Sequence, residues 1–526
     1  MKTLRSRLAL CWGMAFLLLT TQPAATADPA PEKNCAALAQ LTTERFRVEA
    51  TEWVQASATM PQHCLFRVML DARASGMEGM SYGTGIELRL PLEWNGRLLF
   101  QGGGGLNGVL SPAIGRVGEG PSALQRGFAV VSTDSGHRGR NSTDARFGAD
   151  QQAKLDFGYA AVDRTAREAK ALLQRYYGRE PQYTYFMGCS TGGREGMMAA
   201  QRSPLLFDGI VAGDGPFNFT RLTMNQIFSV QTITRIAPKG ADGKPDLSRA
   251  FTDAQLKGVA DAVLAKCDAL DGLKDGMIND FRACKFDPAE QVCDAGKDQR
   301  GAACMTKTQA DALRTVMSGA KNSRGEVLYG STPYDTGIAA SAWRSIHLGS
   351  NGRPPGNASL GRDSLTQFSM TPAAPDFDIL SFNFDKDVAR TQETAAISDA
   401  VATLHSSFAG RGGKLILYHG MSDQGMYTNA LTSWYEQISP RDAQGPQGWA
   451  RLFVVPGMLH CGGGQATDRF DMLAAIQNWV EKGQAPDRVV ASGNAFPGRT
   501  RPLCPYPKVA RYDSGNPEDA ASFSCR

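Results

Sequence analysis

A strand, a tight turn and a helix follow one another at residues 183–200, and this pattern constrains the fold more than any other part of the sequence. Residues 183–187 are apolar and β-prone, and they lead into Gly-Cys-Ser-Thr-Gly, with Ser190 at its centre. Residues 194–200 are better helix formers. Glycines two residues either side of a serine, between a strand and a helix, are typical of a nucleophile elbow, whose strained turn exposes the serine hydroxyl. We therefore predict that Ser190 is a nucleophile; the alternative is an ordinary Gly/Ser turn.

A serine nucleophile needs a base and an acid that orients the base. Chains with such an elbow on an α/β-hydrolase fold carry these residues in the order Ser, Asp or Glu, His. Four histidines follow the elbow: His347, His405, His419 and His460. His460 follows an apolar strand at residues 452–455, and Asp423 lies in the loop after another strand at 414–418. We predict the triad Ser190, Asp423 and His460, and we expect His419 to close the earlier strand.

Two cysteines flank the predicted triad. Cys189 immediately precedes Ser190, and Cys461 immediately follows His460. If these cysteines form a disulfide, their Cα atoms lie about 5.5 Å apart. The nucleophile and the base would then be held side by side by a covalent bond.

With these residues in view, the sequence resembles the tannase/feruloyl esterase family of α/β-hydrolases. The resemblance rests on Cys189-Ser190 in GCSTGGREG, on Asp423 in HGMSD and on His460-Cys461, and it runs over nearly the whole mature chain. It implies a serine carboxylic ester hydrolase that cleaves aromatic acid esters, such as feruloyl or galloyl esters, through an acyl-enzyme. A mono(2-hydroxyethyl) terephthalate hydrolase, also found in this family, is the alternative; a serine peptidase or a non-catalytic binding protein is less favoured.

The alternation of strands and helices predicts an α/β fold with a mostly parallel sheet flanked by helices. The alternation stops near residue 216 and resumes near 414. The resemblance implies that a large lid domain is inserted there. We therefore expect a catalytic domain formed by residues 28–216 and 406–526, and a lid domain at residues 217–405.

Four consecutive glycines, residues 102–105, follow an apolar strand at 97–101. In hydrolases of this fold the matching loop supplies one oxyanion donor, and the residue after the nucleophile supplies the other. We assign these donors to Gly104, with Gly103 as the alternative, and to Thr191. A flexible linker is also compatible with the glycines. A nucleotide-phosphate loop is disfavoured, because the sequence lacks the G-x-x-x-x-G-K-[ST] motif of such loops.

An acidic loop at residues 267–278 alternates carboxylates with glycines. Crowded carboxylates repel one another unless a cation neutralises them, and oxygen ligands suit Ca²⁺. The spacing is not that of an EF-hand. The resemblance implies a structural calcium site in the lid, held by the side chains of Asp268, Asp271 and Asp275 and the backbone oxygens of Leu273 and Met277. A solvated acidic turn is the alternative, and no organic cofactor is expected.

Several residues are weaker candidates for contact with the substrate. Trp343, Phe368, Phe382 and Phe384 are candidate walls of an aromatic pocket, although most aromatic side chains lie in cores. Met426 stands where the terephthalate-type enzymes of the family have an aromatic wall residue. Arg362 is a candidate partner for an acidic substrate, with a surface role as the alternative. His137, after the strand at 128–133, is expected to be structural or to line the pocket.

The N-terminus predicts export. Basic residues, an apolar run at 8–19 and Ala25-Thr26-Ala27 form a signal peptide at residues 1–27, and the run is too short to span a bilayer. We therefore expect a secreted or periplasmic protein. Its remaining charges are nearly balanced, which gives no reason to expect nucleic acid or a membrane as a partner. The expected partner is a small aromatic ester, and the oligomeric state stays open.

Ten cysteines remain after the signal peptide is removed. An even number in an exported chain favours disulfides over metal thiolates, although sequence alone leaves the connectivity open. The spacing and the family pattern favour five pairs: Cys35–Cys64, Cys189–Cys461, Cys267–Cys284, Cys293–Cys304 and Cys504–Cys525.

Overall fold

A computed structural model of the chain describes residues 31–293, 301–350, 352–438 and 445–526. The predicted signal peptide, residues 1–27, lies outside the described residues. None of the helices in the described ranges has the length and apolar composition that crossing a bilayer requires.

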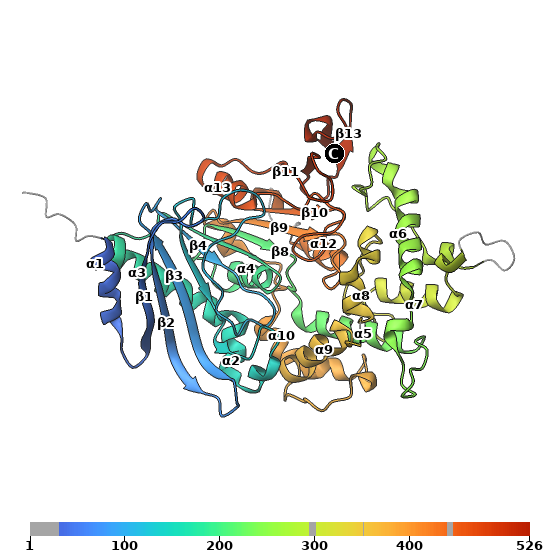
Figure 1. Ribbon diagram of the computed structural model, residues 1–526, viewed down its shortest axis with the longest axis horizontal. Coiled ribbons are helices and arrows are strands. Elements are labelled where there is room, and N and C mark those ends of the chain that lie inside the picture. Colours follow the sequence, from blue (N-terminus) through green and yellow to red (C-terminus); the bar gives the residue numbers. More distant parts are fainter. Residues whose placement is uncertain (1–30, 294–300, 351, 439–444) are drawn as a thin grey trace, which may run out of the picture.

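A ten-stranded sheet forms the centre of the molecule (Figure 1). Its strands are β1 (Phe46–Val54), β2 (His63–Ala74), β3 (Ser81–Pro91), β4 (Arg97–Gln101), β5 (Ala129–Thr133), β6 (His137–Arg138), β7 (Tyr183–Cys189), β8 (Gly209–Gly213), β9 (Lys414–Gly420) and β10 (Ala450–Val455). They lie in the order β1-β2-β3-β5-β4-β7-β8-β9-β10, and β6 pairs with β3. From β5 to β10 all neighbours are parallel, whereas β1, β2 and β3 form an antiparallel extension. The expected mostly parallel sheet is confirmed; β1 and β2 were not foreseen.

Helices cover both faces of this sheet. The helices are α1 (Pro31–Ala37), α2 (Gln151–Leu155), α3 (Ala161–Tyr177), α4 (Thr191–Arg202), α12 (Thr428–Gln437) and α13 (Met472–Lys482). Apolar side chains of α3 and α4 pack in one core cluster with Leu98, Phe100 and Phe186 of the strands. Those of α13 pack in a second cluster with Leu99 and Tyr185, which point to the opposite face. The expected flanking helices are thus confirmed.

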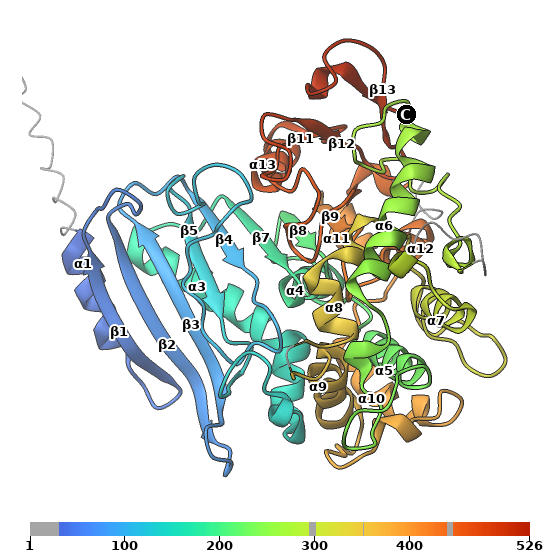
Figure 2. The same cartoon turned by 45° about the vertical axis from the view of Figure 1, so that its right-hand side comes forward.

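A helical segment is inserted between β8 and β9. It contains α5 (Phe219–Thr234), α6 (Asp253–Cys267), α7 (Lys307–Met317), α8 (Ser341–His347), α9 (Gly356–Asp363), α10 (Gln392–Ser398) and α11 (Ser406–Gly410), and its described residues form no named strand. In Figure 2 these green to orange helices lie on the side of the molecule opposite β1 and β2. The boundaries 217–405 stay a prediction.

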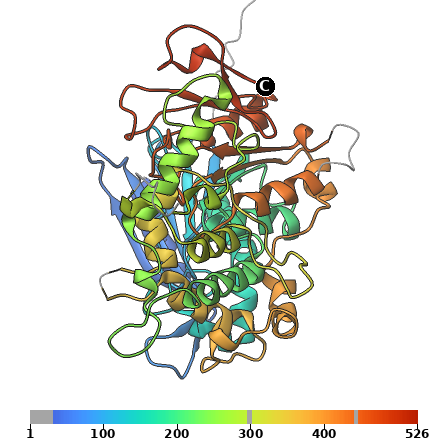
Figure 3. The same ribbon diagram turned by 90° about the vertical axis from the view of Figure 1, so that its right-hand side faces the viewer.

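The C-terminal tail forms two small antiparallel sheets, one of β11 (Val489–Ala491) and β12 (Arg501–Leu503), the other of β13 (Ala510–Tyr512) and β14 (Phe523–Cys525). The tail lies beside the end of α6 (Figure 3), where Arg511 donates a hydrogen bond to the carbonyl of Leu270 at 3.0 Å. The tail therefore contacts the acidic loop that follows α6.

Five disulfides join the described cysteines. They pair Cys35 with Cys64, Cys189 with Cys461, Cys267 with Cys284, Cys293 with Cys304, and Cys504 with Cys525. These are the pairs that the family resemblance implies.

Candidate active site

The backbone at Ser190 has the strained geometry of a nucleophile elbow. Ser190 lies between β7 and α4 with φ +61° and ψ −129°, a conformation that L-residues rarely adopt. A Cβ atom added to Gly188 would lie 2.7 Å from the Cα of Gly192, and one added to Gly192 would lie 2.9 Å from the carbonyl oxygen of Gly103. Both positions therefore require glycine, and the strand, turn and helix follow one another as the sequence predicts.

Asp423 and His460 meet at the same edge of the sheet. Asp423 follows β9 and His460 follows β10, which is its parallel neighbour. The Nδ1 atom of His460 lies 2.7 Å from Oδ2 of Asp423. The other oxygen, Oδ1, accepts the backbone N–H groups of Gly425 at 2.8 Å and Met426 at 2.9 Å. These bonds fix the carboxylate so that Oδ2 faces the imidazole.

Each partner of this pair shifts the pKa of the other. Burial acts to raise the pKa of Asp423, but the charge and hydrogen bond of His460 lower it overall. Burial acts to lower the pKa of His460, but Asp423 raises it overall. An ionised Asp423 that accepts from Nδ1–H leaves Nε2 of His460 free to accept a proton. The pair therefore has the electrostatics that a general base requires.

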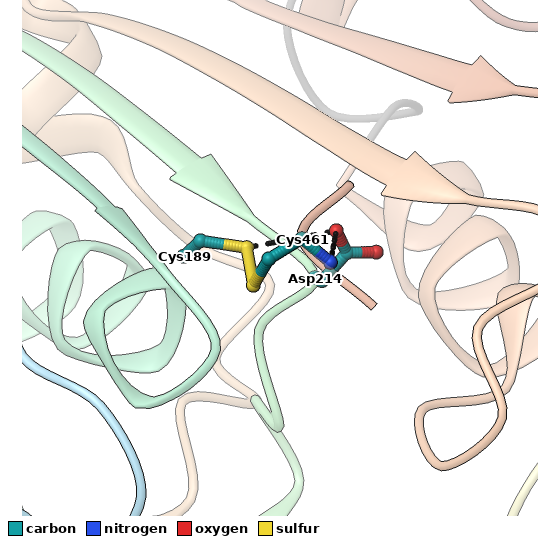
Figure 4. Close-up of side chains that lie close together, drawn as sticks. All are labelled: Cys189, Asp214 and Cys461. Carbon is teal, nitrogen blue, oxygen red and sulfur yellow. Dashed lines mark hydrogen bonds between the residues drawn. A yellow bond between two sulfur atoms is a disulfide. The ribbon is translucent and has the colours of Figure 1, made fainter. Parts of the chain in front are cut away.

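A disulfide links the loop of the candidate base to the loop of the candidate nucleophile. The Cα atoms of Cys189 and Cys461 lie 6.0 Å apart, and the bond joins the residue before Ser190 to the residue after His460 (Figure 4). The two strands that carry these loops, β7 and β10, are separated by β8 and β9. The covalent bond thus brings together loops that the sheet alone would hold apart.

The two predicted oxyanion donors border the elbow. Thr191 is the first residue of α4, and its hydroxyl donates to the carbonyl of Gly105. The N–H of Gly103 is already bound to Oε2 of Glu195 at 2.9 Å, which removes Gly103 as a donor. Among the described residues, the N–H of Gly104 donates no hydrogen bond, and a Cβ atom added to this residue would meet nothing within 4 Å. The geometry therefore favours Gly104 over Gly103.

A buried carboxylate that the sequence analysis missed holds the glycine loop. Glu195, on α4, is almost fully buried. Its Oε1 accepts from the amide of Asn107 at 2.7 Å and from the hydroxyl of Ser135 at 2.8 Å, in addition to the Gly103 contact. The sequence offered little signal for this role, because Glu195 stands beside Arg194 and reads as one half of an ordinary charged pair on a helix.

Two residues of the inserted segment contact the triad loops, and neither was foreseen. Oδ2 of Asp335 accepts from the hydroxyl of Ser422 at 2.7 Å and from the N–H of Gly457 at 2.8 Å. Nε2 of His347 lies 2.9 Å from the carbonyl oxygen of Gln424. The segment therefore supports both the loop that carries Asp423 and the loop that carries His460.

The aromatic candidates occupy different environments. Trp343 lines a small cavity of about 20 Å³ together with Asp423 and Gln424, so it lies near the candidate triad. Phe368 is fully buried and packs against Phe147 at a ring-centroid distance of 5.3 Å. As a correction, Phe368 is a core residue, because the aromatic rings around it leave no side-chain surface for a ligand.

The remaining candidates are spread over the inserted segment and its surroundings. Phe382 and Phe384 pack in an apolar cluster with α5, and Met426 packs against Tyr427 in another. Arg362 is half exposed and paired with Asp363 at 2.8 Å, which fits the surface role. His137 is fully buried and stacks on Phe147 at 3.8 Å, as a structural residue would.

The acidic loop after α6 contains buried carboxylates, one of which is paired with arginines of the C-terminal tail. Asp268 accepts the N–H groups of Asp275 at 3.0 Å and Gly276 at 3.2 Å. Asp275 is paired with Arg501 at 2.5 Å. Burial, together with the charges of Asp275 and Asp268, raises the pKa of Asp271 to about 6. Leu273 and Met277, whose backbone oxygens are predicted ligands, belong to the same loop.

The described residues contain two groups of potential metal-ligand atoms lying within 4.8 Å of one another, and both lie at the triad: Cys189, Asp214 and Cys461 in one, Asp214, Asp423 and His460 in the other. The disulfide occupies both sulfur atoms of the first group. The second is the candidate acid–base pair with one further carboxylate. The carboxylates of the acidic loop do not form such a group.

Comparisons with known proteins agree with this geometry. A family model described as "Tannase and feruloyl esterase" matches residues 78–526. The mono(2-hydroxyethyl) terephthalate hydrolase of Piscinibacter sakaiensis is 38% identical over 541 residues, covering 94% of this chain and 89% of that protein. A probable feruloyl esterase B-1 of Aspergillus oryzae is 29% identical over 463 residues, covering 84% of this chain and 82% of that one. The crystal structure of feruloyl esterase B from Aspergillus oryzae has a TM-score of 0.80 and 25% identity, over 94% of this chain and 100% of that chain.

Proposed function

We propose that this chain, which belongs to the tannase and feruloyl esterase family and is an ester hydrolase, cleaves esters of aromatic carboxylic acids through an acyl-enzyme on Ser190. One observation carries the assignment of roles. His460 contacts Asp423 at 2.7 Å, and the Cys189–Cys461 disulfide tethers this pair to the strained turn that presents Ser190. These contacts support the assignment of Ser190 as nucleophile, His460 as base and Asp423 as acid, the three roles that acyl transfer requires.

The reaction proceeds in two half-reactions. Nε2 of His460 takes the proton of Ser190 while the serine oxygen attacks the ester carbonyl. Asp423 stabilises the imidazolium that forms, and the N–H groups of Thr191 and Gly104 bind the oxyanion. The tetrahedral intermediate expels the alcohol, which takes its proton from His460. Water then attacks the acyl-enzyme by the same route and releases the acid.

A panel of esters tests this function: methyl ferulate, methyl gallate, mono(2-hydroxyethyl) terephthalate and p-nitrophenyl butyrate. We expect the wild type to prefer an aromatic acyl group, and Ser190→Ala to lose turnover of every ester. A variant that keeps turnover would overturn the role of Ser190. Turnover of p-nitrophenyl butyrate alone would overturn the aromatic acyl preference while leaving the triad in place.

A terephthalate half-ester is the second candidate substrate. The mono(2-hydroxyethyl) terephthalate hydrolase is 38% identical to this chain, whereas the probable feruloyl esterase B-1 is 29% identical. This difference favours the terephthalate half-ester as a substrate. Met426 argues in the other direction, because a flexible aliphatic side chain stands where the terephthalate-type enzymes have an aromatic wall residue. The ratio of kcat/KM for the terephthalate half-ester and methyl ferulate separates the two.

We further propose that residues 217–405 form a lid that contains a structural calcium site. The residue types suit the ion, because Asp268 and Asp271 are buried oxygen donors, and burial together with the charges of Asp275 and Asp268 raises the pKa of Asp271. The carboxylates would have to converge further around the ion than they do in the described residues. The side chains of Asp268, Asp271 and Asp275 and the backbone oxygens of Leu273 and Met277 would hold the ion. Bound Ca²⁺ would neutralise the loop and take no part in the reaction.

The same proposal includes export. Five disulfides suit an oxidising compartment, and the signal peptide at residues 1–27 would direct the chain there. Expression with and without residues 1–27, followed by cell fractionation, tests this. Only the full-length precursor should reach the periplasm or the medium, in a form shortened before Asp28; equal export of both would contradict the proposal.

A further inference from the structure

Asp214 is a buried acid that the mechanism above does not use. It directly follows β8, the strand between β7, which leads to Ser190, and β9, which leads to Asp423. Its side chain is fully buried, and its backbone has φ +40°, a conformation unfavourable for a residue with a Cβ atom. Burial of a carboxylate and a strained backbone both cost stability. An acid at this position is therefore expected to have a role.

The contacts of Asp214 join three parts of the candidate site. Oδ1 accepts the N–H of Gly420, at the end of β9, at 2.7 Å. Oδ2 accepts the N–H of Cys461, the residue after the candidate base, at 3.0 Å. Oδ2 also lies 3.6 Å from Sγ of Cys189, so the carboxylate touches both ends of the disulfide (Figure 4). One side chain thus holds the loops of the nucleophile, the acid and the base.

Both oxygens of Asp214 receive backbone N–H donors, and only a carboxylate can accept at both positions. An asparagine would place an NH₂ group against one of the two N–H groups. The titratable groups facing Asp214 come from β9 and from the loops that follow β9 and β10. Nδ1 of His419, on β9, lies 3.5 Å from Oδ1, and atoms of Asp423 and His460 lie within 4.8 Å. The charge of Asp214 therefore acts directly on the candidate acid–base pair.

We propose that Asp214 is a positioning residue for His460: its carboxylate holds the N–H of Cys461 and places a second negative charge beside the imidazolium that forms during catalysis. This inference rests on the proposed function, in which His460 is the base. The charge of Asp214 contributes to raising the pKa of His460, and burial raises the pKa of Asp214 itself to about 6. These shifts agree with the geometry.

Hydrolysis of p-nitrophenyl butyrate by Asp214→Asn, measured from pH 5 to pH 9, tests the proposal. We expect kcat to fall roughly 10- to 100-fold and KM to stay within about threefold of the wild-type value. This loss is smaller than the one expected when Asp423, the acid of the triad, is replaced. Because a negative charge is removed, the pKa of His460 falls, and the acid limb of kcat/KM should move to lower pH. A purely structural role would lower the rate without moving this limb.

Asp208→Asn is the matched control. Asp208 immediately precedes the same strand β8 at its opposite end, where its half-buried carboxylate pairs with Arg411 and accepts the N–H of Thr184. The kcat and KM of this variant should stay within twofold of the wild-type values, and the acid limb of its kcat/KM should not move. If Asp214→Asn does not fold, Asp214→Glu replaces it: the charge is kept, so kcat should fall while the acid limb stays in place.

Two results for Asp214→Asn would overturn the proposal: an unchanged kcat, or a lower kcat with the acid limb of kcat/KM where it is in the wild type. A shifted acid limb in Asp214→Glu would overturn it as well. A wild type that does not turn over any ester would instead refute the proposed function. The two failures are therefore distinguishable.

Discussion

The sheet edge at the triad and the acidic loop after α6 both bury carboxylates, but they satisfy them differently. At the sheet edge, Asp214 and Asp423 come from positions more than two hundred residues apart, and each meets backbone N–H donors and a histidine. In the acidic loop, Asp268 and Asp271 lie three residues apart and also accept N–H and amide donors, but they face no histidine. The two nearby arginines, Arg499 and Arg501, are paired with Asp275. In the first region each carboxylate faces a titratable base, whereas in the second the carboxylates repel one another, and Asp271 feels the charges of Asp268 and Asp275.

This difference indicates two uses of a buried carboxylate. Where protein donors and a titratable base surround it, its charge is available for chemistry. Where like charges surround it, it requires a cation from solution. Changes at the sheet edge should therefore alter turnover, and changes in the acidic loop should alter stability.

The largest effect is expected from Asp423→Asn. The amide cannot hold the imidazole in the tautomer that leaves Nε2 free, so kcat should fall by about 10⁴-fold. Because the attraction that raises the pKa of His460 is also lost, the remaining activity should have its acid limb at lower pH than the wild type. Steady-state kinetics from pH 5 to pH 9 measure both. A loss below tenfold would mean that another group orients the base.

A smaller loss is expected from Glu195→Gln. Its NH₂ group would face either the N–H of Gly103 or the donors on Asn107 and Ser135, so one of the contacts that hold the glycine loop must break. We expect kcat to fall roughly 10- to 100-fold while KM changes little, because the oxyanion donor of Gly104 acts mainly in the transition state. An unchanged kcat would show that the glycine loop keeps its position without Glu195.

Removal of calcium should change stability more than turnover. The folded-state pKa of Asp271, about 6, lies above its ordinary value of 3.8, so its protonated form stabilises the fold below about pH 4, and this contribution is lost as the pH rises through 6. A bound Ca²⁺ ion would replace the proton above that range. Chelation should therefore lower Tm by several degrees at pH 7 and by less at pH 4.5. Equal Tm values with Ca²⁺ and with chelator at pH 7 would refute the calcium site.

The smallest effect is expected from Arg362→Ala. Arg362 is half exposed and pairs with its neighbour Asp363, and such surface pairs contribute about 0–1 kcal/mol. Values of kcat and KM for methyl ferulate and for the terephthalate half-ester should stay within twofold. A selective rise in KM for the acidic half-ester would instead place Arg362 in the substrate pocket.

The parts of the site that depend on local sequence were predictable. The elbow at Ser190 depends on glycines two residues away, and the pairing of Cys189 with Cys461 followed from their positions beside the predicted nucleophile and base. The parallel sheet followed from the alternation of strands and helices. These features depend on local backbone geometry, and short sequence motifs are enough to predict it.

Long-range contacts were not predictable in the same way. Asp214, Glu195 and Asp335 are acidic residues in unremarkable stretches, and only the packing of distant elements shows which N–H groups they accept. Phe368 illustrates the opposite error: an aromatic residue in the inserted segment suggests a pocket wall, whereas its burial against Phe147 depends on contacts 221 residues apart in the sequence. The sequence shows which side chains are present, but only the fold shows which residues surround them.

The most direct test of the account is to locate a covalent adduct on the nucleophile. The folded protein is treated with a serine-reactive fluorophosphonate, digested and analysed by mass spectrometry. The account predicts one adduct on the peptide that contains Ser190, with loss of ester hydrolysis in proportion to labelling, and no adduct in Ser190→Ala. An adduct on another serine that abolishes activity, or full activity in a protein labelled at Ser190, would contradict it.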